Sequence, residues 1–203
     1  RDMRGRTDFR SVLTVTIDGE TARDFDDAIT LERLPNGHHW LGVHIADVAH
    51  YVKEGGALDE TAYTRGTSVY FPERALHMFP APLATGLCSL NPGVDRLVQS
   101  CLMEIDRRGA VVRYELHDGV IRSDARMTYT AVEAILTSHD PETRRQHAAL
   151  VPLFEWMETV YRRLHARRVR RGSIDFDLQA TQLVLDEAGQ VEDVVAYLGT
   201  LKE

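Results

Sequence analysis

The chain has 203 residues, of which 43% are hydrophobic and 27% charged, an ordinary globular composition that suits one large domain or two small ones. No apolar run is as long as a membrane span, the Arg-rich start lacks the apolar segment of a secretory signal, and a net charge of −7 is unexpected for a nucleic-acid binder. Cys88 and Cys101 have apolar neighbours, which predicts buried free thiols and favours the cytoplasm.

The start of the chain predicts strands joined by turns. Residues 1–11 are polar and Arg-rich and predict a linker remnant, whereas the apolar run 12–17 predicts a strand. A further strand is expected at 28–34. The turn signal Pro35-Asn36-Gly37 predicts that 28–34 and 39–46 form a hairpin.

The next segment is expected to contain one short helix and then irregular structure. The helix is predicted at 57–65, after a pair of glycines, and Gly66 ends it. Extended structure is expected from there through Tyr70 to Pro72. The following stretch is irregular because it is punctuated by Pro80, Pro82 and Pro92.

Two further hairpins are expected. Residues 96–106 and 110–122 are predicted to pair around a turn at Asp106-Arg107-Arg108-Gly109. Residues 181–186 and 190–196 are predicted to pair near the end of the chain.

Helices are expected between these hairpins. Thr130-Ala131-Val132-Glu133 is a capping box that predicts a helix starting near 131, and Asp140-Pro141 predicts another start. Pro152 is expected to interrupt, and 153–171 is an amphipathic helix that Gly172 ends. The pattern predicts one α+β domain, with antiparallel hairpins first and helices concentrated after residue 130.

Four aspartates are crowded into a short loop after the first strand. Asp18, Asp24, Asp26 and Asp27 lie within ten positions. Two carboxylates about 4 Å apart repel by roughly 4 kcal/mol at a partly buried site. The loop therefore either points its acids into water or binds a hard cation such as magnesium, manganese or calcium. A solvated acidic loop, a structural calcium loop and a catalytic metal site all remain open at this point.

The segment that contains these acids resembles a known family signature. Residues Thr16–Ala28 are similar to the aspartate motif of the ribonuclease II / ribonuclease R (RNB) family of exoribonucleases, most like its ribonuclease R branch. Further stretches agree in the same order. They are Val43–Val48, Arg65–Pro72 and Gly86–Pro92, with weaker matches at Ala125–Tyr129 and Arg171–Phe176.

The resemblance implies a fold and an activity. Residues 12–203 would be the N-terminal part of an RNB catalytic domain, without the rest of that domain and without the flanking cold-shock and OB-type barrels. The whole protein would be a metal-dependent hydrolytic 3′→5′ exoribonuclease that degrades single-stranded RNA processively to nucleoside 5′-monophosphates. The implied cofactor is Mg²⁺, with Mn²⁺ as a substitute, and the implied ligands and catalytic residues are Asp18, Asp24, Asp26 and Asp27, of which Asp26 is the most critical.

The resemblance also implies an aromatic grip on RNA. Tyr70 and Phe176 match the family's pair of aromatic residues that hold bases near the 3′ end. Stacking on an aromatic ring contributes roughly 1–3 kcal/mol per base. From the residues alone, both would be interpreted as core aromatics, because Val69, Phe71 and Ile174 lie beside them in sequence.

Other polar residues receive structural interpretations. Asp47 is expected to cap the turn that follows it, and His44, His50 and His77 are expected to be structural because none has the spacing of a zinc site. The Arg-rich stretch 162–171 is either a solvated helix face or an RNA-facing surface.

One departure from the family raises an alternative. The family's site also uses an arginine that has no match in this chain. We therefore expect this chain alone to be weakly active or inactive, and the alternative is a catalytically incompetent RNA-binding fragment or pseudo-enzyme. The expected partner is single-stranded RNA, with no membrane and no small-molecule cofactor beyond the metal, and the parent protein is expected to be a monomer.

Overall fold

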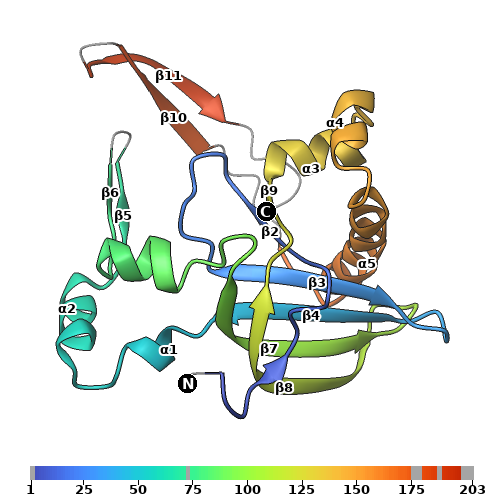
Figure 1. Cartoon of the computed structure of the whole chain (residues 1–203). Helices are drawn as coiled ribbons and strands as arrows, with labels where there is room; N and C mark the ends of the chain where they lie inside the picture. Colours follow the sequence, from blue (N-terminus) through green and yellow to red (C-terminus); the bar gives the residue numbers. More distant parts are fainter. Residues whose placement is uncertain (1–2, 72–73, 175–179, 187–188, 198–203) are drawn as a thin grey trace.

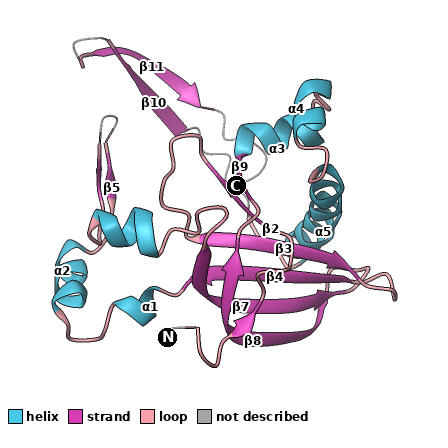
Figure 2. Cartoon of the chain, viewed as in Figure 1, coloured by secondary structure: helices cyan, strands magenta, loops and turns pink. Residues whose placement is uncertain are grey.

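The computed structural model describes residues 3–71, 74–174, 180–186 and 189–197, and a seven-stranded sheet forms its centre (Figures 1 and 2). The strands are β1 (Thr7–Asp8), β2 (Thr14–Asp18), β3 (Asp27–Arg33), β4 (His39–Ala46), β7 (Asp95–Ile105), β8 (Val111–Arg122) and β9 (Ala125–Thr128). They lie in the order β1-β8-β7-β4-β3-β2-β9. The pairs β1–β8 and β2–β9 are parallel and the others antiparallel, so the sheet is mixed.

Helices and two small hairpins surround this sheet. The helices are α1 (Val48–Tyr51), α2 (Ala57–Arg65), the π-helix η1 (Pro82–Leu87), α3 (Tyr129–Leu136), α4 (Pro141–Gln146) and α5 (Val151–Arg170). The hairpins pair β5 (Val69–Tyr70) with β6 (Ala75–Leu76) and β10 (Ala180–Leu185) with β11 (Val191–Tyr197). The predicted α+β class is confirmed, with the longest helix after residue 130. No helix in these described ranges is long and apolar enough to cross a lipid bilayer.

The predicted hairpins form where their turn residues require. Gly37, with a φ of +79°, donates its backbone N–H to the Leu34 carbonyl at 2.9 Å, which closes the β3–β4 turn. In the β7–β8 turn, the Asp106 carboxylate accepts the Ala110 N–H at 2.7 Å. The third predicted hairpin is confirmed by the antiparallel pairing of β10 with β11.

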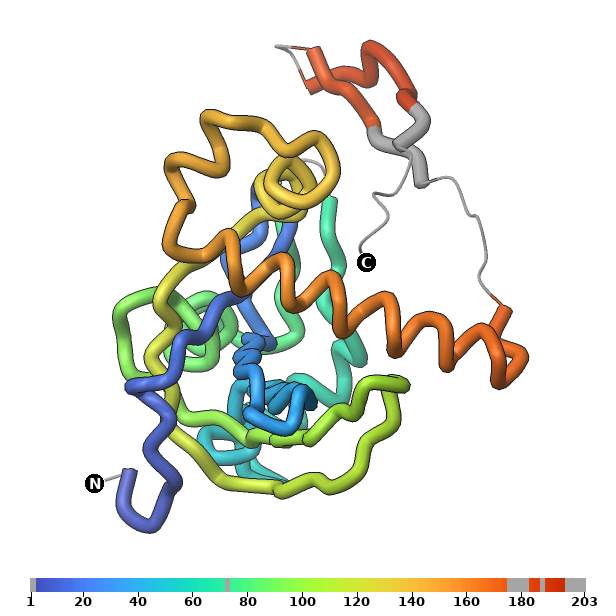
Figure 3. The backbone as a smooth tube through the Cα atoms, turned by 90° about the vertical axis from the view of Figure 1, so that its right-hand side faces the viewer, coloured from blue at the N-terminus to red at the C-terminus, as the bar shows by residue number. Residues whose placement is uncertain are grey.

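The sheet buries a separate core on each face, because alternate residues of a strand point to opposite sides. On one face, α3 and α5 cover an apolar cluster that includes Val15, Leu31, Ile105, Ile135 and Phe154. Figure 3 shows α5 lying along this side of the molecule. The opposite face packs against Phe9, Phe25 and η1, and this cluster also contains Ala28, Leu90, Val98 and Ile121.

The prediction that residues 1–11 are a linker remnant is wrong for its second half. Thr7 and Asp8 pair in parallel with Gly119 and Val120, more than a hundred residues away. Phe9 is buried, and its ring lies 5.6 Å from that of His44. The segment is polar overall, so the local sequence pattern does not reveal that Phe9 is buried or that Thr7 and Asp8 form an edge strand.

Two helix starts also differ from those predicted. Helix α3 begins at Tyr129, because the Thr128 hydroxyl accepts the Ala131 N–H at 3.0 Å and thereby caps it, so the capping box at 130–133 does not set the start. Helix α5 begins at Val151. Pro152 lies in its first turn, where a missing N–H costs no helical hydrogen bond, so Pro152 does not interrupt the chain as predicted.

Candidate active site

The acidic loop joins β2 to β3 at one end of the sheet (Figure 1). Asp18 is the last residue of β2, where it pairs with Thr128 of β9. Asp27 is the first residue of β3 and pairs with Ile45 of β4. The sheet therefore fixes the two acids that bracket the loop, and Asp24 and Asp26 lie between them.

Hydrogen bonds hold the loop itself in place. The Arg126 guanidinium, from β9, donates to the carbonyls of Gly19 and Glu20. The Ser89 hydroxyl accepts the Phe25 N–H at 3.0 Å and donates to the Arg23 carbonyl at 2.9 Å. The buried Phe25 ring packs into the second core. The Arg126 guanidinium lies over this ring, with its Cζ atom 5.6 Å from the ring centroid. The loop that contains the aspartates is therefore anchored at several points, which limits how far the carboxylates can move apart.

Burial and the charges of neighbouring acids shift the pKa of two of the aspartates, Asp18 and Asp26. Burial raises the pKa of Asp18 to about 6, and the charges of Asp27, Asp26 and Asp24 add to this rise while Arg126 opposes it. Loss of water around Asp26, and then the charges of Asp24 and Asp27, raise the pKa of Asp26. The four acids therefore act on one another as a single electrostatic group.

The donor chemistry of the loop fits a hard divalent cation. Carboxylate oxygens are the ligands that Mg²⁺ and Mn²⁺ prefer. Asp18 Oδ2 is buried and has no hydrogen-bond partner in the described part of the chain, as expected of an oxygen left for an ion. Across the same residues, however, no three His, Cys, Asp or Glu side chains are grouped closely enough to hold a metal ion together. The acids share one loop without forming a complete ligand set.

Tyr70 stands beside the acidic loop. It lies in β5 with 64% of its surface exposed, and its hydroxyl donates to Asp24 Oδ2 at 2.7 Å. This hydrogen bond raises the pKa of Tyr70. Its sequence neighbours Val69 and Phe71 are exposed as well, so the interpretation of Tyr70 as a core aromatic is wrong. Phe176, the other predicted RNA-binding aromatic, lies outside the described residues.

Two neighbours of the acids were not predicted to belong to the site. His77 Nδ1 lies 3.7 Å from Asp24 Oδ2, and its ring meets that of Tyr70 edge-on at 6.3 Å. Arg126 lies in a stretch that matches the family, but its spacing in sequence from the loop does not indicate a contact. The β5–β6 hairpin places His77 beside the acidic loop, and β9 places Arg126 there. Predicting these contacts would have required knowing how distant strands pair.

The remaining polar candidates have structural roles. Asp47 accepts the His50 N–H at 3.2 Å and caps α1, as predicted, and it also forms a buried ion pair with Arg6 at 2.5 Å. His44 is buried between Ser100 and Thr30 hydroxyls, and burial lowers its pKa to about 4, which keeps it neutral.

Both cysteines are free thiols, as predicted. Cys88 is buried and Cys101 is half-buried, and neither forms a disulfide within the described residues. Burial raises the pKa of the Cys88 thiol to about 11, so it is unreactive.

Comparison with known proteins identifies the class of protein to which this site belongs. The sequence model of the RNB domain family matches residues 6–200, so the chain belongs to the RNB family. Among individual proteins, it is 48% identical to ribonuclease R of Thermotoga maritima over 196 residues, covering 96% of this chain and 27% of that protein. It is 45% identical to ribonuclease R 1 of Lactococcus lactis over 185 residues, covering 91% of this chain and 22% of that protein.

A solved structure is similar as well. The structure of Mycoplasma genitalium RNase R in complex with ribose methylated single-stranded RNA matches with a TM-score of 0.86 and 31% identity, over 95% of this chain and 30% of that one. The chain thus spans about a quarter of the length of these curated relatives.

A first prediction concerns the charge of Asp18 in metal-free protein. The pKa of Asp18 rises from an ordinary 3.8 to about 6 on folding, so stability present below pH 4 is lost as the pH rises through 6. Asparagine cannot ionise. Asp18→Asn should therefore equal the parent at pH 4 and exceed its free energy of unfolding at pH 7 by about 1–2 kcal/mol, after allowance for solvent screening.

Urea unfolding in EDTA at pH 4, 5, 6 and 7 measures this difference. Asp118→Asn, at an exposed position on β8, is the control for removing a negative charge elsewhere. A difference between parent and Asp18→Asn that is constant across this pH range would contradict the assignment.

Proposed function

We propose that the protein containing this chain is a metal-dependent 3′→5′ exoribonuclease that degrades single-stranded RNA processively to nucleoside 5′-monophosphates. Membership of the RNB family and the identity with ribonucleases R support this proposal. The structural observation that carries it is the loop of four aspartates, held in place by Arg126 and Ser89, with the exposed ring of Tyr70 tied to it.

The residues of this chain have separable tasks in that reaction. Asp18, Asp24, Asp26 and Asp27 would hold Mg²⁺ or Mn²⁺, which when bound supplies charge stabilisation for the phosphate and lowers the pKa of water. Arg126 fixes the backbone of the loop through the Gly19 and Glu20 carbonyls, which limits the rearrangement needed for the carboxylates to close on an ion. Preorganisation of this kind avoids the cost of rearranging charged groups during the reaction.

Tyr70 would position the RNA. Its hydroxyl donates a hydrogen bond to Asp24 Oδ2 at 2.7 Å, while its ring is exposed to solvent. A base stacked on this ring would place its own phosphodiester near the acids, and stacking accepts any base. This geometry suits an enzyme that removes nucleotides regardless of sequence.

The deciding experiment uses 5′-labelled single-stranded RNA resolved at nucleotide length, with Mg²⁺ and with EDTA. A ladder that shortens from the 3′ end only with Mg²⁺ supports the proposal. Binding without shortening by the full-length protein would favour the alternative of an RNA-binding pseudo-enzyme. For the 203-residue chain alone we propose weak activity or none, and for the whole protein a cytoplasmic, monomeric state.

A second prediction concerns Tyr70. In the full-length protein, Tyr70→Ala should weaken the binding of short RNA by about tenfold and change the length of the final product, because one stacking platform is lost. Tyr70→Phe keeps the ring and loses the bond to Asp24, so it should keep the product length of the parent. Product sizing on denaturing gels and fluorescence anisotropy measure both effects. If Tyr70→Ala and Tyr70→Phe weaken RNA binding and change the product length to the same extent, the hydroxyl rather than the ring matters and the stacking role is wrong. If Tyr70→Ala equals the parent in both measurements, the stacking role is wrong as well.

A further inference from the structure

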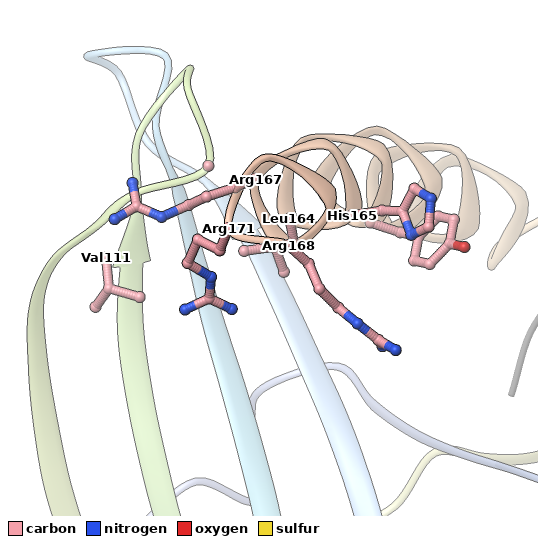
Figure 4. Close-up of a pocket in the computed structure, with 8 residues that line it drawn as sticks. Val111, Leu164, His165, Arg167, Arg168 and Arg171 are labelled. Atoms are coloured by element: carbon pink, nitrogen blue, oxygen red, sulfur yellow. The ribbon is translucent and has the colours of Figure 1, made fainter. Parts of the chain in front are cut away.

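A hollow of about 420 Å³ lies between the C-terminal half of α5 and the β7–β8 hairpin (Figure 4). It is at the opposite end of the sheet from the acidic loop, because the β7–β8 turn contacts the β3–β4 turn through an Arg107 hydrogen bond to the Asn36 carbonyl. The seven residues of β3 separate the two ends by about 20 Å. The residues that line the hollow are Gly109, Val111, Tyr161, Leu164, His165, Arg167, Arg168 and Arg171.

The walls of the hollow are fixed by close packing. A Cβ at Gly109 would lie 2.7 Å from the Arg163 carbonyl oxygen, so only glycine lets the β7–β8 turn rest directly on α5. Val111 and Leu164 contribute apolar surface. The rings of Tyr161 and His165 are stacked at 5.5 Å, and Tyr161 is 46% exposed.

The charge of the hollow is positive and incompletely neutralised. Neither Arg167 nor Arg171 forms an ion pair with another described residue, whereas Arg162, five residues before Arg167, is paired with Glu158 at 2.7 Å. The negative end of the helix dipole also stabilises arginines in the last turn of α5. That effect explains positive charge at the end of α5, but it does not explain an open hollow with an aromatic wall in a chain of net charge −7.

We infer that this hollow binds single-stranded nucleic acid, with Arg167 and Arg171 contacting phosphates and Tyr161 stacking on a base. Guanidinium groups match phosphate oxygens, and an exposed aromatic ring lining the same hollow can stack on a base, which an acidic peptide lacks. The inference rests on the proposed function in taking RNA as the ligand. It adds a second contact surface, about 20 Å from the acids, that would hold the strand upstream of the cleaved end.

The test is fluorescence anisotropy of 5′-fluorescein dodecauridylate with the 203-residue chain in EDTA, from 50 to 300 mM salt. The double variant Arg167→Gln/Arg171→Gln should bind about tenfold more weakly at low salt. Its plot of log affinity against log salt should be shallower by about 1.4, because two phosphate contacts are lost. The matched control Arg145→Gln/Arg162→Gln removes the same charge from exposed arginines that already have Glu partners, and should bind within threefold of the parent.

The outcomes separate this inference from the proposed function. Affinity and salt slope of Arg167→Gln/Arg171→Gln that equal those of the control would overturn it, as would equally tight binding of polyglutamate, which would assign the hollow to an acidic protein partner. Tyr161→Ala compared with Tyr161→Phe tests the stacking wall without changing charge. Loss of binding in the Arg variants supports the inference even if the full-length protein proves unable to shorten RNA.

Discussion

Asp26→Asn in the full-length protein that contains this chain should lower turnover of 5′-labelled single-stranded RNA by roughly a hundred- to a thousandfold, the usual cost of losing one preorganised charge-stabilising group. Asp26 is the last residue of the acidic loop, directly before β3, where the charges of Asp24 and Asp27 act on it. Its backbone carbonyl accepts the Ala46 N–H at 2.9 Å, so the residue is fixed in position by the sheet. Asparagine keeps the side chain's shape and removes the charge that a cation requires.

The control for this loss is Glu20→Gln, which removes a carboxylate from the same loop outside the predicted ligand set and should change turnover by less than about threefold. RNA affinity in EDTA should stay within twofold for both variants. The added stabilisation by millimolar Mg²⁺ should be smaller in Asp26→Asn than in the parent. Equal Mg²⁺-induced shifts in melting temperature, or unchanged turnover, would show that Asp26 does not belong to a metal site.

Arg6→Ala should be the most destabilising single change near the start of the chain, at about 3 kcal/mol, or a fall in melting temperature of roughly 6 to 12 °C. The Arg6 side chain is 10% exposed and that of its partner Asp47 is 5% exposed. Removing the guanidinium leaves a buried carboxylate that still accepts the His50 N–H at the start of α1 but has lost its counterion. A buried charge without its counterion is far more costly than a broken surface pair.

The matched control is Arg10→Ala, four residues later. Arg10 pairs with Asp8 and Asp95, but its side chain is 37% exposed, so water replaces the lost partner and the change should cost less than about 1 kcal/mol. Urea unfolding at pH 7 compares the two. If Arg6→Ala and Arg10→Ala destabilise equally, the first residues do not anchor the fold through this ion pair.

Local chemistry in the sequence was enough to predict most elements. The turns at Pro35–Gly37 and Asp106–Gly109 both form, because each contains a glycine at positive φ and the Asp106 carboxylate accepts the N–H groups of Arg108 and Ala110, all within four residues. Helix α2 runs from Ala57 to Arg65 as predicted, since Gly66 ends it. The errors at the starts of α3 and α5 are shifts of two residues, about half a turn.

The sequence by itself determined the α+β class, the hairpins and the run of four aspartates, since each depends on residues a few positions apart. Only the tertiary structure decided that Arg6 and Phe9 anchor the start of the chain, that Arg126 holds the acidic loop, and that Tyr70 and His77 reach Asp24. It also decided that Arg167 and Arg171 face a hollow closed by Gly109. These contacts join residues from tens to more than a hundred positions apart, and the pairing of distant strands, which no local pattern encodes, sets which of them meet.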